Sequence, residues 1–229
     1  MKKVKVGITI GDINGVGLEV ILKTLCNPMV SKNITPVIYG STKVVSYHKN
    51  IINDINISYQ SVNSTSRLYE DKINIFNCWE ENVNINLGTL NEDGGKYAML
   101  SLEQAVKDIK EGNIDVIVTA PINKKAMQLA GFQYPGHTEY FADQFKDSQQ
   151  LMLMTSEDLK VGLVTNHLPL NEVAESITKE TILKKLKILN NSLKMDFGLE
   201  RPTIAVLGLN PHAGDEGSIG KEEIEIIRP

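Results

Sequence analysis

Apolar runs of strand length alternate with helical patterns along most of this 229-residue chain. Residues 4–10, 114–118 and 204–209 are apolar runs that end in polar turns containing glycine or proline. Between such runs, apolar residues recur at helical spacing, as in residues 94–111 and 178–198. Because strands that alternate with helices usually form parallel sheets, the sequence predicts an α/β fold with a mostly parallel sheet.

The most informative turns are those that carry histidine. Two predicted strands, residues 161–165 and 204–209, are followed at nearly the same offset by His167 and His212. A third histidine, His137, lies in a polar loop. The carboxyl ends of parallel strands meet at one edge of a sheet, where ligands bind, so we predict that these three histidines share that edge. The alternative for His212 taken alone is that it only hydrogen-bonds turn carbonyls.

The chemistry that converging histidines favour is metal binding. Neutral imidazoles without a nearby cysteine or acidic ligand suit Zn²⁺ or a similar divalent ion, which would polarise a substrate oxygen. The fourth histidine, His48, lies in a polar helix without a matching partner, so we expect it on the solvated surface. The sequence contains no G-x-S-x-G motif, and neither Cys26 nor Cys78 stands beside a histidine, which disfavours nucleophilic hydrolysis.

Three further positions leave alternatives open. The turn at residues 11–17 follows a strand and precedes a helix, as phosphate sites do, but its glycines do not match G-x-G-x-x-G, so its partner is unassigned. Lys124 contacts either an anionic ligand or solvent alone. Thr138 is expected to cap the following helix, and this role is compatible with ligand contact because a helix start attracts anions.

Composition and charge exclude several kinds of partner. The formal net charge of −4 gives no electrostatic reason to expect nucleic acid or an anionic membrane. No apolar run approaches the roughly 18 residues of a membrane helix, and the first residues do not resemble a signal peptide. The two isolated cysteines suit a reducing compartment. We therefore expect a cytoplasmic protein that binds neither nucleic acid nor membranes.

Five motifs, in order along the chain, resemble those of the 4-hydroxythreonine-4-phosphate dehydrogenase family of vitamin B6 (pyridoxine and pyridoxal phosphate) biosynthesis. They are ITIGDINGVGLE at residues 8–19, TAPINK at 119–124, PGHTE at 135–139, TNHLPL at 165–170 and NPHAGDEG at 210–217. The resemblance implies an oxidoreductase that uses NAD or NADP to oxidise the secondary alcohol of a small phosphorylated hydroxy amino acid. The resulting β-keto acid would then decarboxylate.

The resemblance also implies an architecture. It predicts a homodimer with a shared active site, built from two-lobed α/β subunits related to isocitrate and isopropylmalate dehydrogenases. We expect the first lobe to span residues 1–128 and the second to span residues 129–229, with the second lobe incomplete at its C-terminus. The related enzymes hold the dinucleotide without a G-x-G-x-x-G motif, which agrees with the glycine pattern of residues 11–17.

The matching motifs transfer roles to four residues. By resemblance, His167 and His212 would be ligands of a divalent metal (Zn, Mg or Co), and His137 and Thr138 would contact the substrate. The family's third metal-binding histidine belongs to a later motif that this sequence does not contain. We therefore expect the chain to correspond to the first two thirds of the enzyme and to be inactive alone. Alternative functions are a dehydrogenase for threonate or erythronate 4-phosphate, and a noncatalytic metal- or phosphate-binding α/β module.

Overall fold

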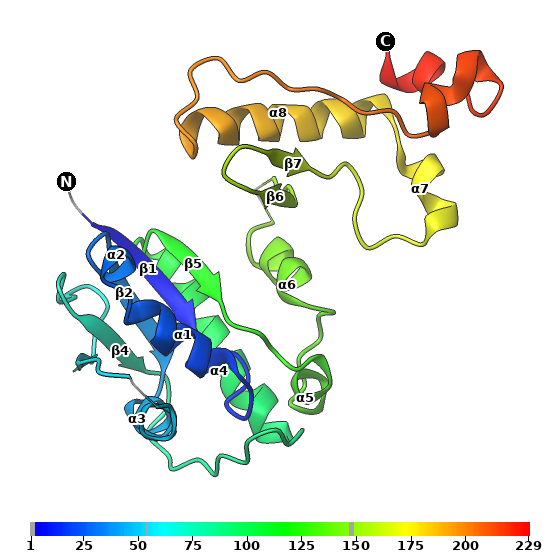
Figure 1. Ribbon diagram of the computed structural model, residues 1–229. Helices are drawn as coiled ribbons and strands as arrows, with labels where there is room; N and C mark the ends of the chain where they lie inside the picture. The colour runs from blue at the N-terminus through cyan, green and yellow to red at the C-terminus, as the bar shows by residue number, and fades with distance from the viewer. Residues whose placement is uncertain (1–2, 54, 147–148) are drawn as a thin grey trace. The chain divides into compact units, whose positions relative to one another are not determined.

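The computed structural model describes residues 3–53, 55–146 and 149–229. They form two compact units, Met1–Gln144 (unit 1) and Phe145–Pro229 (unit 2), which are described separately below (Figure 1). The lobes expected from the sequence divide at residue 128 instead, and that division stays a prediction. No helix in the described ranges is both long and apolar enough to cross a lipid bilayer.

Unit 1 is built on a five-stranded parallel sheet with the strand order β3-β4-β2-β1-β5. This sheet and its connecting helices confirm the predicted α/β fold. In chain order the elements are β1 (Val4–Thr9), α1 (Gly17–Leu25), α2 (Pro28–Ser31), β2 (Ile34–Gly40), α3 (Thr42–Ile51), β3 (Tyr59–Val62), β4 (Ile73–Asn77), α4 (Glu92–Lys110), β5 (Val116–Thr119), α5 (Lys124–Leu129) and α6 (His137–Gln144).

The direction in which the chain crosses the sheet reverses at β1. After β1 the chain passes through α1 to β2 on one side, and it later returns through α4 to β5 on the other side. Strands β1 and β5 pair in parallel as far as Thr9 and Thr119, so the turns that follow them emerge side by side. In α/β sheets, a reversal of this kind creates the crevice where ligands bind.

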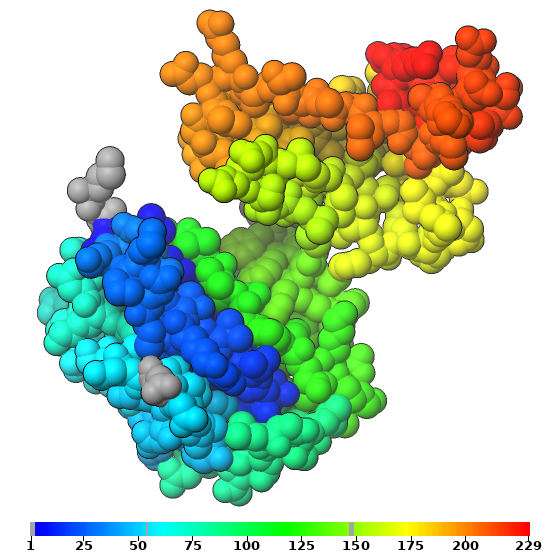
Figure 2. Space-filling view, in the orientation of Figure 1, coloured from blue at the N-terminus to red at the C-terminus, as the bar shows by residue number. Residues whose placement is uncertain are grey.

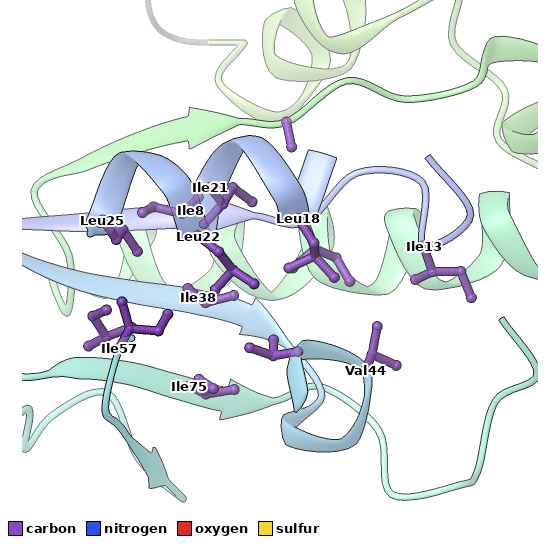
Figure 3. Close-up of a cluster of buried hydrophobic side chains, with 14 of the residues drawn as sticks. Ile8, Ile13, Leu18, Ile21, Leu22, Leu25, Ile38, Val44, Ile57 and Ile75 are labelled. Atoms are coloured by element: carbon purple, nitrogen blue, oxygen red, sulfur yellow. The ribbon is translucent and has the colours of Figure 1, made fainter. Parts of the chain in front are cut away.

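Helices α1 and α3 cover one face of the sheet, and α4 covers the other. Apolar side chains recur along α1 at spacings of three and four residues, which places them on one side of the helix (Figure 3). They pack against Ile38 and Ile75 of the sheet. On the opposite face, Ala105 of α4 packs with Val37 and Tyr39. The α1 residues in the core are Leu18, Ile21, Leu22 and Leu25.

Strand β5 differs from its prediction as a buried strand, because it forms an edge of the sheet. Val116 and Val118 share a sheet face with their partners in β1, yet Val118 is 50% exposed. Strand β4, by contrast, lies inside the sheet between β3 and β2. Hydrophobicity shows that a segment can be buried, but it does not show which neighbours cover it.

Unit 2 contains a two-stranded antiparallel sheet and several helices. Its elements are β6 (Leu153–Thr155), β7 (Lys160–Gly162), α7 (Leu170–Ser176), α8 (Lys179–Met195), the turn η1 (Pro211–Gly217) and the short helix η2 (Glu223–Ile227). Thr178 caps α8, because its hydroxyl accepts a hydrogen bond from the Thr181 N–H.

Two predicted strands of unit 2 are wrong in extent or in kind. The strand expected at residues 161–165 ends at Gly162 and pairs antiparallel with β6. Residues 204–209 form no strand in the part of the chain that the structure describes. This segment is not a buried run either, since Leu207 is 82% exposed, and the orange stretch that contains it lies at the surface in Figure 2. An apolar run becomes a strand only when a neighbouring strand accepts its hydrogen bonds.

Candidate functional site

The turns that follow β1 and β5 pack against each other at the reversal point of the sheet. The Asp12 N–H donates a hydrogen bond to the Pro121 carbonyl, with an N···O distance of 3.1 Å. Gly11 has a φ of +67°, and a Cβ there would lie 2.2 Å from the same carbonyl oxygen, so only glycine fits. An apolar groove of about 220 Å³ runs beside these turns, between α1 and β5. The turn at residues 11–17 therefore lies where α/β sheets bind ligands, and its partner stays unassigned.

Asparagine side chains hold this turn against the start of α4. Asn14 Nδ2 donates to Asn91 Oδ1, and Asn14 Oδ1 accepts from the Asn86 N–H, each at 2.8 Å. Asn91 Oδ1 also accepts from the Gly94 N–H and thereby caps α4. These bonds fix the turn before any ligand arrives, which is the usual property of a preformed binding surface.

His48 supports the same turn from within the core, which corrects the prediction of a surface role. The side chain is 2% exposed, and its Nε2–H donates to the Ile13 carbonyl at 2.8 Å. Burial lowers the pKa of this imidazole, so it is neutral near pH 7. A signal was present in the sequence, because Val44, Val45 and His48 fall on the buried side of α3.

His137 and Thr138 begin helix α6. Because the helix starts at His137, Thr138 lies in its first turn and is not the predicted N-cap. His137 Nε2 is buried, and among the described residues it has no hydrogen-bond partner. The ring stacks on Phe141 with 6.3 Å between centroids, and burial lowers its pKa. The unpartnered nitrogen of a neutral imidazole can donate a hydrogen bond to a ligand or accept one from it, depending on the tautomer.

Lys124 stands at the exposed start of α5. Asn123 caps this helix, since its Oδ1 accepts hydrogen bonds from the backbone N–H groups of Lys125 and Ala126. Lys124 itself is exposed. Both roles considered for it, contact with an anion and simple solvation, stay open.

His167 and His212 share an unusual backbone conformation in unit 2. Their φ angles are +55° and +52°, in the left-handed region. Within the described ranges, the other non-glycine residues with positive φ are Ala213, Asp215 and Glu216, which adjoin His212. Left-handed backbone costs about 1–2 kcal/mol for each such residue and persists where the surroundings enforce it, often at functional sites. No feature of the sequence predicts this conformation.

The metal assignment fits the donor chemistry of these two histidines but not a complete ligand set. Imidazole nitrogens are good ligands for Zn²⁺ and Co²⁺, whereas Mg²⁺ prefers oxygen. Nowhere in residues 3–53, 55–146 and 149–229 do three or more His, Cys, Asp or Glu side chains come together to hold a metal. His137 belongs to unit 1, and the other two histidines belong to unit 2. The predicted edge of a parallel sheet is wrong for His167 and His212, because β7 pairs antiparallel and residues 204–209 form no strand in the described ranges. The ligand roles of these two histidines stay predictions.

Comparisons with known proteins agree on one family. The family described as pyridoxal phosphate biosynthetic protein PdxA matches residues 32–229. A 4-hydroxythreonine-4-phosphate dehydrogenase from Bacteroides thetaiotaomicron is 46% identical over 99% of this chain, which spans 62% of that relative's length. A protein from Oceanobacillus iheyensis with the provisional name D-threonate 4-phosphate dehydrogenase is 34% identical and is covered over 69% of its length.

A solved structure gives the same result. The crystal structure of 4-hydroxythreonine-4-phosphate dehydrogenase from Klebsiella pneumoniae matches all of this chain and 69% of its own, with a TM-score of 0.85 and 30% sequence identity. The sequence motifs and the overall structural match therefore lead to the same group of proteins.

Proposed function

Because this chain belongs to the PdxA family, we propose that it acts in the NAD- or NADP-linked oxidation of 4-phosphooxy-L-threonine during pyridoxal phosphate biosynthesis. The secondary alcohol would become a ketone, and the 2-amino-3-oxo acid would lose carbon dioxide to give 3-amino-2-oxopropyl phosphate. The observation that carries this proposal is the family match over residues 32–229, which include the three histidine motifs.

We assign the substrate contacts to the start of α6. The unpartnered His137 Nε2 would hydrogen-bond a polar substrate atom, and the Thr138 hydroxyl lies in the same first turn. Free backbone N–H groups at a helix start attract phosphate, which suits a phosphorylated substrate. Burial keeps His137 neutral near pH 7, so it would orient the substrate without adding a positive charge.

We assign the metal to His167 and His212. Both are imidazole donors on constrained backbone, which supports Zn²⁺ or Co²⁺ more than Mg²⁺. A bound divalent ion would lower the pKa of the substrate alcohol and stabilise negative charge on its oxygen. Two imidazoles leave coordination positions for other ligands. A cytoplasmic homodimer with a shared active site is part of the same proposal.

A second candidate substrate is D-threonate 4-phosphate. The relative that carries this provisional name covers the whole chain at 34% identity. Its substrate has the same four-carbon length and phosphate, and it carries a hydroxyl in place of the amino group. Nothing in the described sites distinguishes these two groups, so a direct comparison of substrates is needed.

The test is an assay of the full gene product, including any residues encoded beyond Pro229. We expect NADH or NADPH formation with 4-phosphooxy-L-threonine, loss of activity in EDTA, and recovery on adding Zn²⁺ or Co²⁺. The substrates for comparison are D-threonate 4-phosphate and D-erythronate 4-phosphate. A higher kcat/KM for either acid would favour the second candidate. Metal binding without turnover of any substrate would support the noncatalytic module instead.

Variants test the residue assignments. We expect His167→Ala and His212→Ala to weaken Zn²⁺ binding in calorimetry, and His137→Ala to raise the KM while leaving metal affinity unchanged. The matched control is His48→Gln, which alters a buried histidine outside the proposed ligand set. Zn²⁺ binding of wild-type strength in both His167→Ala and His212→Ala would contradict the metal assignment.

A further inference from the structure

The turn that carries His212 is left-handed through five successive residues. His212, Ala213, Gly214, Asp215 and Glu216 have φ angles between +43° and +80°. Such a turn is unfavourable for the four non-glycine residues, so contacts elsewhere must select it. Backbone hydrogen bonds close it at both ends, and the donors are the N–H groups of Ala213, Ser218 and Ile219.

One buried carboxylate contacts this turn on its N-terminal side. Glu223 begins η2, and its side chain is 2% exposed. Its Oε1 accepts from the Asn210 backbone N–H at 2.7 Å, and its Oε2 accepts from Asn210 Nδ2 at 3.0 Å. Glu222 Oε2 also accepts from Asn210 Nδ2, at 2.7 Å. Asn210 lies two residues before His212, so these bonds fix the chain as it enters the turn.

The same carboxylate borders the turn on the other side of His212. A Cβ added to Gly214 would lie 2.8 Å from Glu223 Oε2 and 2.5 Å from the Gly220 carbonyl oxygen. The backbone at Gly214 therefore packs directly onto the Glu223 carboxylate. Gly214 lies two residues after His212. Glu223 therefore hydrogen-bonds the chain before this histidine and packs against the chain after it.

The charge of Glu223 strengthens these contacts. Hydrogen bonds from the Asn210 backbone and side chain lower the pKa of Glu223, so it is ionised at neutral pH. Hydrogen bonds to a carboxylate are stronger than those between neutral groups. The interaction also requires a carboxylate. Asn210 presents two donors, and a carboxylate can accept a hydrogen bond at each of its oxygens.

We propose that Glu223 is a positioning residue that holds the left-handed turn and thereby fixes the direction of the His212 imidazole. Its importance for metal binding rests on the proposed function, in which His212 is a ligand. Glu223 touches neither metal nor substrate in this proposal and acts through Asn210 and Gly214. Groups that orient a metal ligand typically change affinity by about 10- to 100-fold when they are removed.

The test compares Glu223→Gln with Glu225→Gln in the full gene product. Both variants replace a glutamate of the same short helix, but Glu225 is exposed. In Glu223→Gln, the new amide NH₂ would oppose the Asn210 NH₂. We expect Co²⁺ affinity to fall about 10- to 100-fold in Glu223→Gln and to change less than twofold in Glu225→Gln.

A metal-free measurement separates this proposal from the metal assignment. Hydrogen exchange should accelerate at the amides of Ala213, Ser218 and Ile219 in Glu223→Gln, while the amides of α8 keep their protection. Accelerated exchange in a protein that binds no Co²⁺ would support the positioning role and refute the metal assignment. Unchanged exchange at the three turn amides would overturn the positioning role whatever the metal does. Equal acceleration throughout α8 would overturn it as well, by showing a general loss of structure.

A glycine comparison keeps the test decisive if Glu223→Gln folds poorly, and a double variant tests whether Glu223 acts through His212. Gly214→Ala and Gly198→Ala both place alanine at positive φ, but only the first would collide with Glu223. We expect Gly214→Ala alone to weaken Co²⁺ binding. In a His212→Ala background, Glu223→Gln should cause no further loss of affinity. A further loss equal to that in the wild type would show that Glu223 does not act through His212.

Discussion

Unit 1 and unit 2 hold their candidate sites by different means. Unit 1 covers a parallel sheet with helices on both faces, and the turns of its site rest on that core. Within the described residues, the buried apolar side chains of unit 2 are Ile177, Ile182 and Leu193. Its histidine turn is held by hydrogen bonds to a buried carboxylate and by three backbone hydrogen bonds. Polar contacts hold the turns of both sites, but only in unit 1 do they rest on an extensive apolar core.

The comparison shows that precise local geometry does not require a large core. Residues 212–216 adopt a single unfavourable conformation in the unit with fewer buried apolar groups. Directional hydrogen bonds can select such a conformation, because each bond is lost when the backbone rotates. Apolar contacts are less directional, and they set overall stability more than the angle of one turn. Substitutions should therefore have different consequences in the two units.

The largest effect should follow a cavity in the core of unit 1. Leu22 is fully buried between α1 and the sheet, so Leu22→Ala should lower the free energy of unfolding by about 2–5 kcal/mol. Urea denaturation followed by circular dichroism measures this change. Leu183→Ala in α8 of unit 2 is the control, because Leu183 is 46% exposed. Equal losses in the two variants would contradict the expectation that burial of Leu22 in the core determines the cost.

The next effect should come from the buried polar pair of unit 1. Tyr39 Oη donates to Asp108 Oδ2 at 2.6 Å, and both side chains are buried. Tyr39→Phe would remove a donor from a buried carboxylate and should cost about 1–3 kcal/mol. Tyr47→Phe, at a more exposed position, should change stability by less than about 0.5 kcal/mol. Unchanged stability in Tyr39→Phe would show that the Asp108 carboxylate tolerates the loss of this donor, because Gln104 still donates to its other oxygen.

The sequence predicts unit 1 better than unit 2, for a physical reason. The β1, β2 and α4 segments carry local patterns of apolar residues, and their partners are strands and helices of the same unit. The segment at residues 204–209 carries an equally clear pattern but has no strand partner among the residues that the structure describes, so the pattern fails there. Strand formation depends on a distant neighbour, which periodicity cannot supply.

The residues of the candidate sites also differ in how well the sequence predicts their roles. The positions of Asn123 and Thr178 at helix starts follow from local capping rules. The roles of His48 and Glu223 depend on contacts with residues more than ten positions away. His48 at least shares a helical face with apolar residues, whereas Glu223 has no sequence signal at all. The sequence also does not predict that His212, which is not a glycine, has a left-handed backbone conformation.

Acid should weaken unit 1 through its buried histidines. Burial lowers the pKa of His48, so the unfolded state binds a proton more readily than the folded state. Stability is therefore unaffected well above pH 6.5 and falls as the pH drops below that value, by at most about 1.4 kcal/mol per pH unit for one group. Between pH 7.5 and 5.5, the free energy of unfolding should fall less steeply with decreasing pH in His48→Gln than in the wild type.

His137 must be tested in parallel, because burial lowers its pKa as well. His137→Gln should remove its own share of the slope, and the double variant should remove both shares. A slope that is unchanged in His48→Gln would mean that the folded state accepts the proton at His48 without penalty.

The smallest effect should be a gain in stability in the turn of unit 2. Ala213 has a φ of +52°, so Ala213→Gly relieves a steric cost of about 1–2 kcal/mol while adding about 0.5–1 kcal/mol of unfolded-state entropy. The steric term is larger, and we expect a net gain of about 0.5–1 kcal/mol. Ala174→Gly, in the right-handed helix α7, should instead lose about 1 kcal/mol. In thermal unfolding, the midpoint should rise for Ala213→Gly and fall for Ala174→Gly. A fall in both variants would mean that residue 213 is not held in a left-handed conformation in solution.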